Sequence, residues 1–409
     1  QSPGRRLPFP APSTPASMSP GPPLASSRAA AAGASQPVVE VTEDPDRPWL
    51  GRFLRALQPA AAGNVLVRER YLCFVSLPAG LEGWRRHAEL HKAVVQGAQE
   101  RTVAEGSVWG RWGAGVDDIL AAGLHDGGED VTARVRAELR EAGAETAQVP
   151  EEVLEQMVSL SCVFRVNSFS FPGEDCRRND LILPTICRAN HSCLPNAEIV
   201  PGKTPGETKL VAIRPIAAGE PVEICYFPSD YLMRTTPQRR AALEQKFHFQ
   251  CGCRRCEAPT DLTRRFAAGP TCCGCGGGGD FSVDKSSQLC CIACGKAMQD
   301  DALASRMLSE EAEVERLLES LEEPEDLSLP AADGLACLAP EALQRCRAFA
   351  EAHGRHRAAA EVARRRVPAL HAEGHHVEAA AAQVAFVNAA KELLPPGASG
   401  LAWLPPVHP

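Results

Sequence analysis

The chain has 409 residues and a formal net charge of −8 at pH 7. This length suits two or three domains with a sizeable core, and no stretch is basic enough to suggest direct binding to nucleic acid. No apolar run reaches the ~18 residues that a membrane-spanning helix needs, so we expect a soluble protein without membrane contact.

The N-terminal segment, residues 1–46, is rich in Pro, Ser and Ala, and no acidic residue precedes Glu40. Such a segment can bury little apolar surface, so we expect it to be disordered. Its arginines, Arg5, Arg6 and Arg28, also fit an organelle transit peptide. The expected compartment is therefore the cytoplasm or nucleus, with an organelle as the alternative.

The chain from residue 47 to 230 has the patterns of a mixed α+β domain. Residues 51–56 and 62–67 read as strand, turn and strand. Residues 82–162 carry apolar side chains at helical spacing and predict a helical insert. Further strands are expected at 162–166, 197–200, 209–213 and 222–226, with a turn at 217–220.

The C-terminal part is predicted to be helical, over residues 299–323 and 339–393. Gly354 and Gly374 lie at expected helix breaks about twenty residues apart, by the usual helix-stop signals. This spacing fits an antiparallel helical-hairpin array of the TPR-like kind, and an ordinary helical bundle is the alternative.

The chain contains 17 cysteines, most of them between Cys187 and Cys294. Their Cys-x-Cys and Cys-x2-Cys spacings favour metal thiolates in a reducing compartment over secreted disulfides. The first group, Cys251, Cys253 and Cys256, supplies three of the four ligands that structural zinc takes. The alternative is that these cysteines are reduced core residues.

A second group has the spacing of a two-knuckle zinc ribbon, with the expected ligands Cys272, Cys275, Cys291 and Cys294. Gly276 and Gly295 follow the second cysteine of each knuckle, where a left-handed turn directs N–H groups toward the thiolates. Cys273 and Cys290 are adjacent cysteines, so the ligand register could shift by one. We expect this second zinc site to stabilise the chain or contact a partner.

Three short motifs follow one another in the middle of the chain. Residues 190–196 read Asn-His-Ser-Cys-Leu-Pro-Asn, residues 223–226 read Glu-Ile-Cys-Tyr, and residues 249–256 read Phe-Gln-Cys-Gly-Cys-Arg-Arg-Cys. In this order and spacing they resemble the end of a SET domain with its post-SET zinc cluster, as in protein lysine methyltransferases of the SET-and-MYND type. The resemblance covers residues 47–257 and, more weakly, the C-terminal helices.

The resemblance implies an α+β SET-domain fold, with small sheets around a knot-like core in which the Asn-His segment threads through a loop. It implies S-adenosylmethionine as methyl donor, and zinc at both cysteine groups, with Cys193 as the fourth ligand of the first. Tyr226 is implied to be the catalytic hydroxyl, and Phe247 and Phe249 to line the lysine channel with it. The residues implied to bind the cofactor are Gly51, Arg52, Asn167, Asn190, His191, Tyr226 and Phe249.

The expected domain boundaries follow from these patterns. They are a disordered segment at 1–46, the N-terminal part of SET at 47–81, the helical insert at 82–162, the SET core at 163–230, the post-SET region at 231–260, the zinc ribbon at 261–298, the C-terminal helical domain at 299–396 and a disordered tail at 397–409.

Two positions depart from the family pattern. Phe53 stands where the family has the second Gly of its cofactor loop, and a Phe there could either crowd the cofactor or point away. Before Cys162 the chain contains a single cysteine, Cys73, so no cysteine-rich MYND zinc module is expected. The helical insert occupies its place.

Three functions follow as hypotheses. The first is a protein-lysine N-methyltransferase that acts on a histone or non-histone protein and is a monomer. The second is a catalytically weak SET scaffold that binds partners through the zinc ribbon and the C-terminal helices. The third, a zinc-dependent nucleic-acid regulator, needs a basic face that the sequence does not show.

Overall fold

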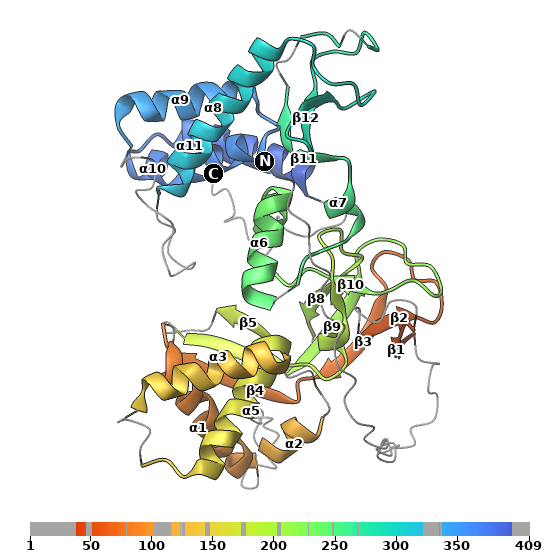
Figure 1. Cartoon of the computed structure of the whole chain (residues 1–409), viewed down its shortest axis with the longest axis vertical. Helices are drawn as coiled ribbons and strands as arrows, with labels where there is room; N and C mark the ends of the chain where they lie inside the picture. Colours follow the sequence, from red (N-terminus) through yellow and green to blue (C-terminus); the bar gives the residue numbers. More distant parts are fainter. Residues whose placement is uncertain are drawn as a thin grey trace, which may run out of the picture. The chain divides into compact units, whose positions relative to one another are not determined.

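The structure is a computed structural model. It describes residues 38–45, 51–78, 80–101, 116–122, 124, 127–143, 148–172, 177–202, 206–227, 229–247, 249–267, 270–272, 274–321, 335 and 338–394. The described residues all belong to the compact unit that begins at Val38 (Figure 1).

The first two strands form an antiparallel pair, β1 (Val39–Glu43) with β2 (Arg52–Ala56). The expectation of disorder over residues 1–46 is therefore wrong for β1. Val39 packs against the core cluster that contains Leu54, and this burial stabilises a strand that composition alone did not indicate. The predicted strand at 51–56 is confirmed.

A second sheet carries the largest cluster of core residues in this part of the chain. It has the order β3-β9-β8 and is antiparallel, with β3 (Val65–Arg70), β9 (Glu207–Ala212) and β8 (Ala197–Pro201). Leu66, Leu210 and Ile224 are among the buried side chains beneath it. The strands predicted at 62–67, 197–200 and 209–213 are confirmed, with shifted ends.

A third sheet, of order β4-β6-β5, lies under helices. Its strands are β4 (Cys73–Pro78), β6 (Arg177–Ile182) and β5 (Ser168–Pro172), and the sequence did not predict them. The helices of this region are α1 (Gly83–Arg101), α2 (Val116–Ala121), α3 (Gly128–Glu141) and α5 (Glu151–Asn167), which confirms a helical insert (Figure 1).

The strand predicted at 162–166 is wrong, because α5 continues through it to Asn167. Leu160, Val163 and Phe164 are three and four residues apart, and all are buried in one cluster with β4. This helical spacing along one face outweighs the strand preference of a short apolar run. The helix therefore ends five residues later than expected, and β5 begins directly after it.

Shorter segments precede β8 and follow β9 in the chain. They comprise the 3₁₀ turn η2 (Ile186–Arg188), strands β7 (Asn190–His191) and β10 (Glu223–Ile224), the 3₁₀ turn η3 (Ser229–Met233), and helices α6 (Thr236–Phe247) and α7 (Arg254–Glu257). The strand predicted at 222–226 is confirmed as the two-residue β10. The turn at 217–220 is present, since the N–H of Glu220 donates to the carbonyl of Ala217.

The zinc-ribbon segment folds as a three-stranded sheet of β11 (Thr260–Phe266), β12 (Phe281–Asp284) and β13 (Leu289–Cys291). Four helices follow: α8 (Asp301–Glu319), α9 (Pro340–Ala352), α10 (Arg357–Ala372) and α11 (His376–Leu393). Gly354 and Gly374 lie between successive helices, as predicted. Among the described residues, no helix is both long and apolar enough to span a membrane.

Candidate active site and two candidate metal centres

The Asn-His segment and the segment before Tyr226 pair with each other. β7 and β10 run parallel, with Asn190 opposite Glu223 and His191 opposite Ile224. Asn196 fixes the same pair, because its amide donates to the carbonyl of Pro221 (2.7 Å) and accepts from the N–H of Glu223 (2.7 Å). Two segments thirty residues apart are thus held side by side, while the threading of one through a loop stays a prediction.

Tyr226 is fixed at both ends by this pair. Its hydroxyl donates to the backbone carbonyl of Ala189, 3.0 Å away, and its backbone N–H donates to Nδ1 of His191, 3.1 Å away. Burial is the main cause that raises the pKa of Tyr226 well above its usual value. The phenol is therefore neutral at physiological pH and can act as a hydrogen-bond donor.

An aromatic cluster surrounds Tyr226. The ring centroids of Tyr226 and Phe247 are 5.1 Å apart and meet edge to face, and those of Tyr226 and Phe249 are 6.4 Å apart. His191 lies 5.3 Å from Tyr226 and 6.0 Å from Phe249. Phe227, which the sequence analysis did not name, packs edge to face on Phe247 at 5.5 Å. Residues of three separate motifs thus form one aromatic wall, which contains the Tyr226 hydroxyl as a polar group.

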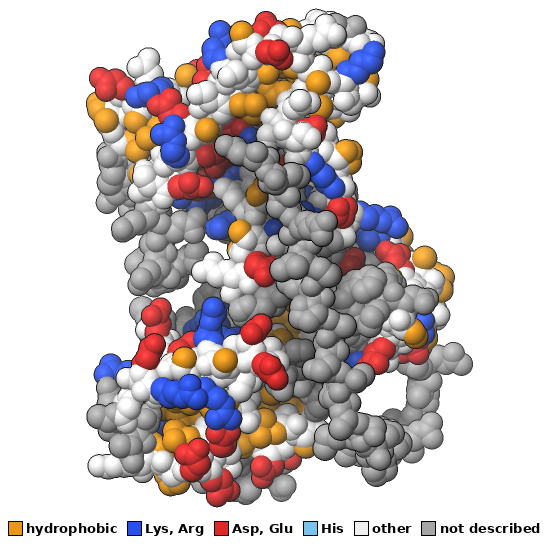
Figure 2. All heavy atoms as spheres, viewed as in Figure 1, with side chains coloured by type: hydrophobic (Ala, Val, Ile, Leu, Met, Phe, Trp, Pro, Cys, Tyr) orange, Lys and Arg blue, Asp and Glu red, His pale blue; other side chains and the backbone are white. Residues whose placement is uncertain are grey.

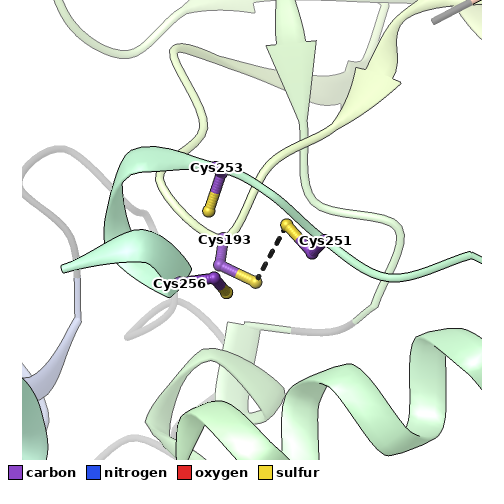
Figure 3. A group of neighbouring side chains, drawn as sticks. All are labelled: Cys193, Cys251, Cys253 and Cys256. Atoms are coloured by element: carbon purple, nitrogen blue, oxygen red, sulfur yellow. Dashed lines mark hydrogen bonds between the residues drawn. The ribbon is translucent and has the colours of Figure 1, made fainter. Parts of the chain in front are cut away.

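The first cysteine group comes together around one point (Figure 3). Cys193 follows β7, while the other three lie on and before α7, and the four sulfur atoms all lie within 4.8 Å of one another. The Sγ atoms of Cys193 and Cys251 are 4.0 Å apart. Four converging thiols fit a tetrahedral zinc ion, so this group could hold a structural metal.

His191 connects the aromatic cluster with the first cysteine group. Its Nε2 lies 3.3 Å from Sγ of Cys193, while its Nδ1 accepts the N–H of Tyr226. Burial lowers the pKa of His191 to about 4, so the ring is neutral, with its proton on Nε2. That N–H can donate to the Cys193 thiolate, as groups next to a metal ligand commonly do.

Two arginines near the first cysteine group were missed. Arg239 is fully buried, and its guanidinium lies 3.8 Å from Sγ of Cys256. Arg255 donates to the carbonyl of Cys193 at 3.2 Å. A zinc ion bound by four thiolates would keep net negative charge, and these cations would compensate it. For Arg255, the sequence signal that could have indicated this role was the pair of arginines at 254–255 inside the cysteine motif.

The second cysteine group is also assembled, with its four sulfur atoms within 4.8 Å of one another. The four cysteines brought together are those of the expected register, Cys272, Cys275, Cys291 and Cys294, and they could hold a metal. Cys290 instead points its thiol toward Asp284, 3.7 Å away, and Cys273 lies outside the described residues. Gly276 and Gly295 have φ of 66° and 73°, the left-handed turns that the knuckles require.

The remaining predicted cofactor residues lie on neighbouring elements. Gly51 precedes β2 with φ of 57°, and Arg52 is close enough to Arg188 in η2 to lower its pKa, after the larger effect of burial. Asn167 ends α5, and its amide donates to the carbonyl of Val163 at 2.7 Å. Their roles toward a cofactor stay predictions.

Two further positioning groups were not anticipated. The carboxylate of Glu69 accepts from the N–H groups of Thr185 (3.0 Å) and Ile186 (2.8 Å), and so caps η2 directly before β7. The carbonyl of Ala189 holds the Tyr226 hydroxyl. Neither can be found from a motif, because one contact crosses more than a hundred residues and the other uses backbone alone.

The paired β7 and β10, the aromatic cluster and the cysteine groups belong to an α+β fold of small sheets and C-terminal helices, and the chain is related to the SET-domain lysine methyltransferases. Over 122 residues it is 33% identical to histone-lysine N-methyltransferase SMYD3 of Mus musculus and equally to that of Homo sapiens. Over 134 residues it is 31% identical to protein-lysine N-methyltransferase SMYD4 of Homo sapiens.

These matches are partial. The SMYD3 match covers 29% of this chain and 26% of SMYD3, and the SMYD4 match covers 32% and 14%. The chain therefore spans about a quarter of the length of SMYD3 and less of SMYD4. No protein-family model matches.

Among solved structures, the SET domain of LSMT bound to lysine and AdoHcy is similar at 16% identity. The alignment covers 88% of this chain and 89% of that one, with a TM-score of 0.32. The same domain bound to methyl-lysine and AdoHcy aligns with the same TM-score at 15% identity.

Proposed function

We propose that the protein transfers a methyl group from S-adenosylmethionine to a lysine side chain of a protein substrate. One observation carries the proposal: the Tyr226 hydroxyl is held beside the Asn190–His191 strand inside an aromatic wall of Phe247 and Phe249. The first cysteine group, which could bind zinc, includes Cys193, two residues after His191, and Cys251, two residues after Phe249. A bound metal would therefore hold these two segments together.

The residues that would hold the cofactor are Gly51 and Arg52 before and on β2, Asn167, and the Asn190–His191 strand. In support of this, an added side-chain carbon on Gly51 would meet no atom of the described residues within 4 Å. Open space next to a glycine with left-handed φ lets backbone approach a ligand closely. When bound, S-adenosylmethionine supplies the methyl group on its sulfonium.

The side chains of this site would position a lysine amine and keep water away from it. The apolar faces of Phe247 and Phe249 favour an uncharged amine, since ammonium loses hydration there. The neutral Tyr226 hydroxyl and the nearby carbonyls would orient the amine lone pair along the attack line. No general base is required in this wall, which agrees with its lack of a carboxylate–histidine pair.

The substrate is proposed as a class only. SMYD3 is named a histone-lysine and SMYD4 a protein-lysine methyltransferase, so both histone and non-histone proteins are candidates for this chain. Nucleic acid is a poorer candidate. On the face drawn in Figure 2, acidic and basic side chains are interspersed over the described residues and do not merge into a continuous basic area.

The test uses radiolabelled S-adenosylmethionine with cell lysate or histones. Tyr226→Phe should abolish transfer while retaining fold and zinc. Tyr231→Phe is the matched control, because Tyr231 is a buried tyrosine whose hydroxyl donates to the carbonyls of Gln238 and Arg239 and not to the Asn-His strand. Equal transfer by wild type and Tyr226→Phe, or none by wild type, would refute the enzyme proposal.

A catalytically weak scaffold is the second candidate, and Phe53 favours it. Leu54 belongs to the core cluster, so the neighbouring Phe53 side chain points to the opposite face of β2, where it is 3% exposed. A large buried ring there could fill space next to the proposed cofactor loop. Calorimetric titration with S-adenosylmethionine separates the two: no binding by wild type and recovered binding by Phe53→Gly would support the scaffold.

A further inference from the structure

Lys246 lies at the edge of the aromatic cluster. It is the penultimate residue of α6, and its Nζ is 5.3 Å from the ring centroids of both Phe227 and Phe247. Both distances are those of a cation–π contact. Since Phe247 also packs on Tyr226, this ammonium is one ring away from the proposed catalytic hydroxyl.

Two arginines from other elements gather nearby around one buried carboxylate. Arg178 on β6 donates from Nε to Asp180 at 2.8 Å, and Arg86 on α1 lies 3.4 Å from the other carboxylate oxygen. The Asp180 side chain is 1% exposed, whereas those of Arg178 and Arg86 are 42% and 27% exposed. One acid therefore faces two guanidinium groups that still reach solvent.

The three cations lie close enough to influence one another electrostatically. Although much of the Lys246 side chain is exposed, desolvation of its ammonium lowers its pKa, and the nearby positive charges of Arg178 and Arg86 lower it further. Burial and the charge of Arg178 likewise lower the pKa of Arg86. The positive charges repel one another, which is the electrostatic signature of a site that favours an anion.

In the part of the chain that the structure describes, Glu138 and Glu244 are the further acids to consider near this group. Glu138 is held by Arg165 (3.1 Å) and His87 (2.9 Å). Glu244 lies two residues before Lys246 on α6, which places it about 200° around the helix from it. Among the described residues, Arg86, Arg178 and Lys246 against Asp180 therefore leave an excess of positive charge, and we name these three cations the basic rim.

We propose that the basic rim selects protein substrates in which an acidic side chain lies close to the target lysine. The proposal rests on the proposed function and adds the substrate class. A carboxylate beside the target lysine would relieve the repulsion within the rim and gain a charge-assisted hydrogen bond from Lys246. A flanking Lys or Arg would add to the repulsion, so lysine-rich tails are disfavoured.

The chain's net charge does not contradict this selection. A net charge of −8 attracts basic proteins at long range, but that attraction is screened within about 8 Å at physiological salt. Within that distance the local charges decide, and at the aromatic cluster they are positive. Discrimination therefore depends on residues next to the target lysine and not on the overall charge of the substrate.

The experiment uses three peptides with one central lysine, flanked by Glu, Ala or Lys. Fluorescence anisotropy measures binding to the full chain at low and high salt, and labelled S-adenosylmethionine measures methyl transfer. We expect the Glu peptide to bind roughly tenfold tighter than the Lys peptide at low salt, with the difference shrinking at high salt.

Lys246→Glu should reverse the order of the Glu and Lys peptides. Lys391→Glu, on the exposed face of α11, is the matched charge reversal and should leave the order unchanged. Zinc content and circular dichroism verify the fold of both variants. An unchanged order in Lys246→Glu, tighter binding of the Lys peptide by wild type, or no binding of any peptide would overturn the proposal.

Failure of the proposed function gives a different result. If the Glu peptide binds in a Lys246-dependent manner but no peptide or lysate protein is methylated, the basic rim is a docking site of the scaffold and the enzyme proposal falls. If lysate proteins are methylated but the order of the peptide affinities is the same with and without the Lys246→Glu change, the enzyme proposal stands. The proposed selection by the basic rim is then wrong.

Discussion

The guanidinium of Arg255 joins the first cysteine group to the last helix of the chain. It donates to the carbonyl of Leu393, 2.8 Å away at the C-terminal end of α11, and to the carbonyl of Cys193, 3.2 Å away. A cation at a helix C-terminus is favourable because the last carbonyls there lack helical partners. The loop that carries Cys193 and the helical array are thus coupled through one side chain.

Arg255→Ala should therefore destabilise the protein more than the loss of a surface charge would. Both carbonyls lose a charged donor in a partly buried place, which costs about 2–3 kcal/mol of unfolding free energy. Urea unfolding measures this difference. Arg254→Ala is the matched control, since its exposed neighbouring side chain should cost less than about 0.5 kcal/mol. Equal losses in the two variants would contradict a specific role for Arg255.

The metal content separates ligand cysteines from their neighbours. We expect two zinc ions per chain by elemental analysis, and one after either Cys193→Ser or Cys272→Ser. Cys290→Ser is the control, because Cys290 is buried next to Cys291 but directs its thiol to Asp284. A loss of zinc from Cys290→Ser would mean that the register of the second group is wrong.

The features that could be predicted from the sequence are those set by residues close together in the chain. Cysteine spacing predicted the second four-thiol group and three members of the first, while Cys193 and the meeting of His191, Tyr226 and Phe249 were implied by the family resemblance. Spacing within a motif is local, but His191 and Tyr226 lie near each other because β7 pairs with β10. Helix breaks at Gly354 and Gly374 were predictable for the same local reason.

What the sequence could not predict depends on distant partners. Residues 162–166 are helical because Val163 and Phe164 pack on β4. That strand was not predicted from the sequence. The basic rim joins Arg86, Arg178 and Lys246 from three elements, with no spacing to mark it. Tertiary contacts of this kind override local propensity.

Glu69 should be a positioning residue for the proposed reaction. Its carboxylate caps η2, whose next residues are Ala189, which holds the Tyr226 hydroxyl, and Asn190. Glu69→Ala removes two accepted hydrogen bonds and should cost about 1–2 kcal/mol of unfolding free energy. Methyl transfer should fall with it, while zinc content stays at two per chain.

Glu69→Gln is the variant that distinguishes positioning from charge. Burial raises the pKa of Glu69, so its negative charge gains little there, and the Gln oxygen can still accept from η2. We expect Gln to restore most of the stability and transfer that Ala loses. If Gln is as damaging as Ala, the carboxylate charge and not the cap is what matters at this position.

The environment of Glu311 predicts that the stability of the C-terminal region depends on pH. It lies on α8 with its side chain 4% exposed, and accepts from Arg264 on β11 (2.6 Å and 2.5 Å) and from Nε2 of His356 (3.1 Å). Burial alone would raise its pKa, but the hydrogen bonds from Arg264 and His356 lower it to about 2, from an ordinary value of 4.5.

The sign follows from this lowered pKa. A carboxyl whose pKa is lower in the folded state stabilises it fully above its unfolded pKa, and the gain disappears as pH falls through the folded value. The shift corresponds to about 3 kcal/mol at pH 7. Glu311→Gln should therefore unfold about 3 kcal/mol more easily at pH 7, and its deficit should shrink from about pH 4.5 toward pH 2.

The comparison of Glu311→Gln with wild type cancels acid effects that both proteins share, including loss of thiolate-bound metal. Burial lowers the pKa of His356, and its Nδ1 accepts the N–H of Ala358 at the start of α10. Urea unfolding at pH 7, 4 and 3 measures the deficit. If the deficit is constant with pH, the Glu311 side chain stabilises the fold through its packing and not through its charge. The ion pair with Arg264 would then add nothing to the stability of the junction between β11 and the helices.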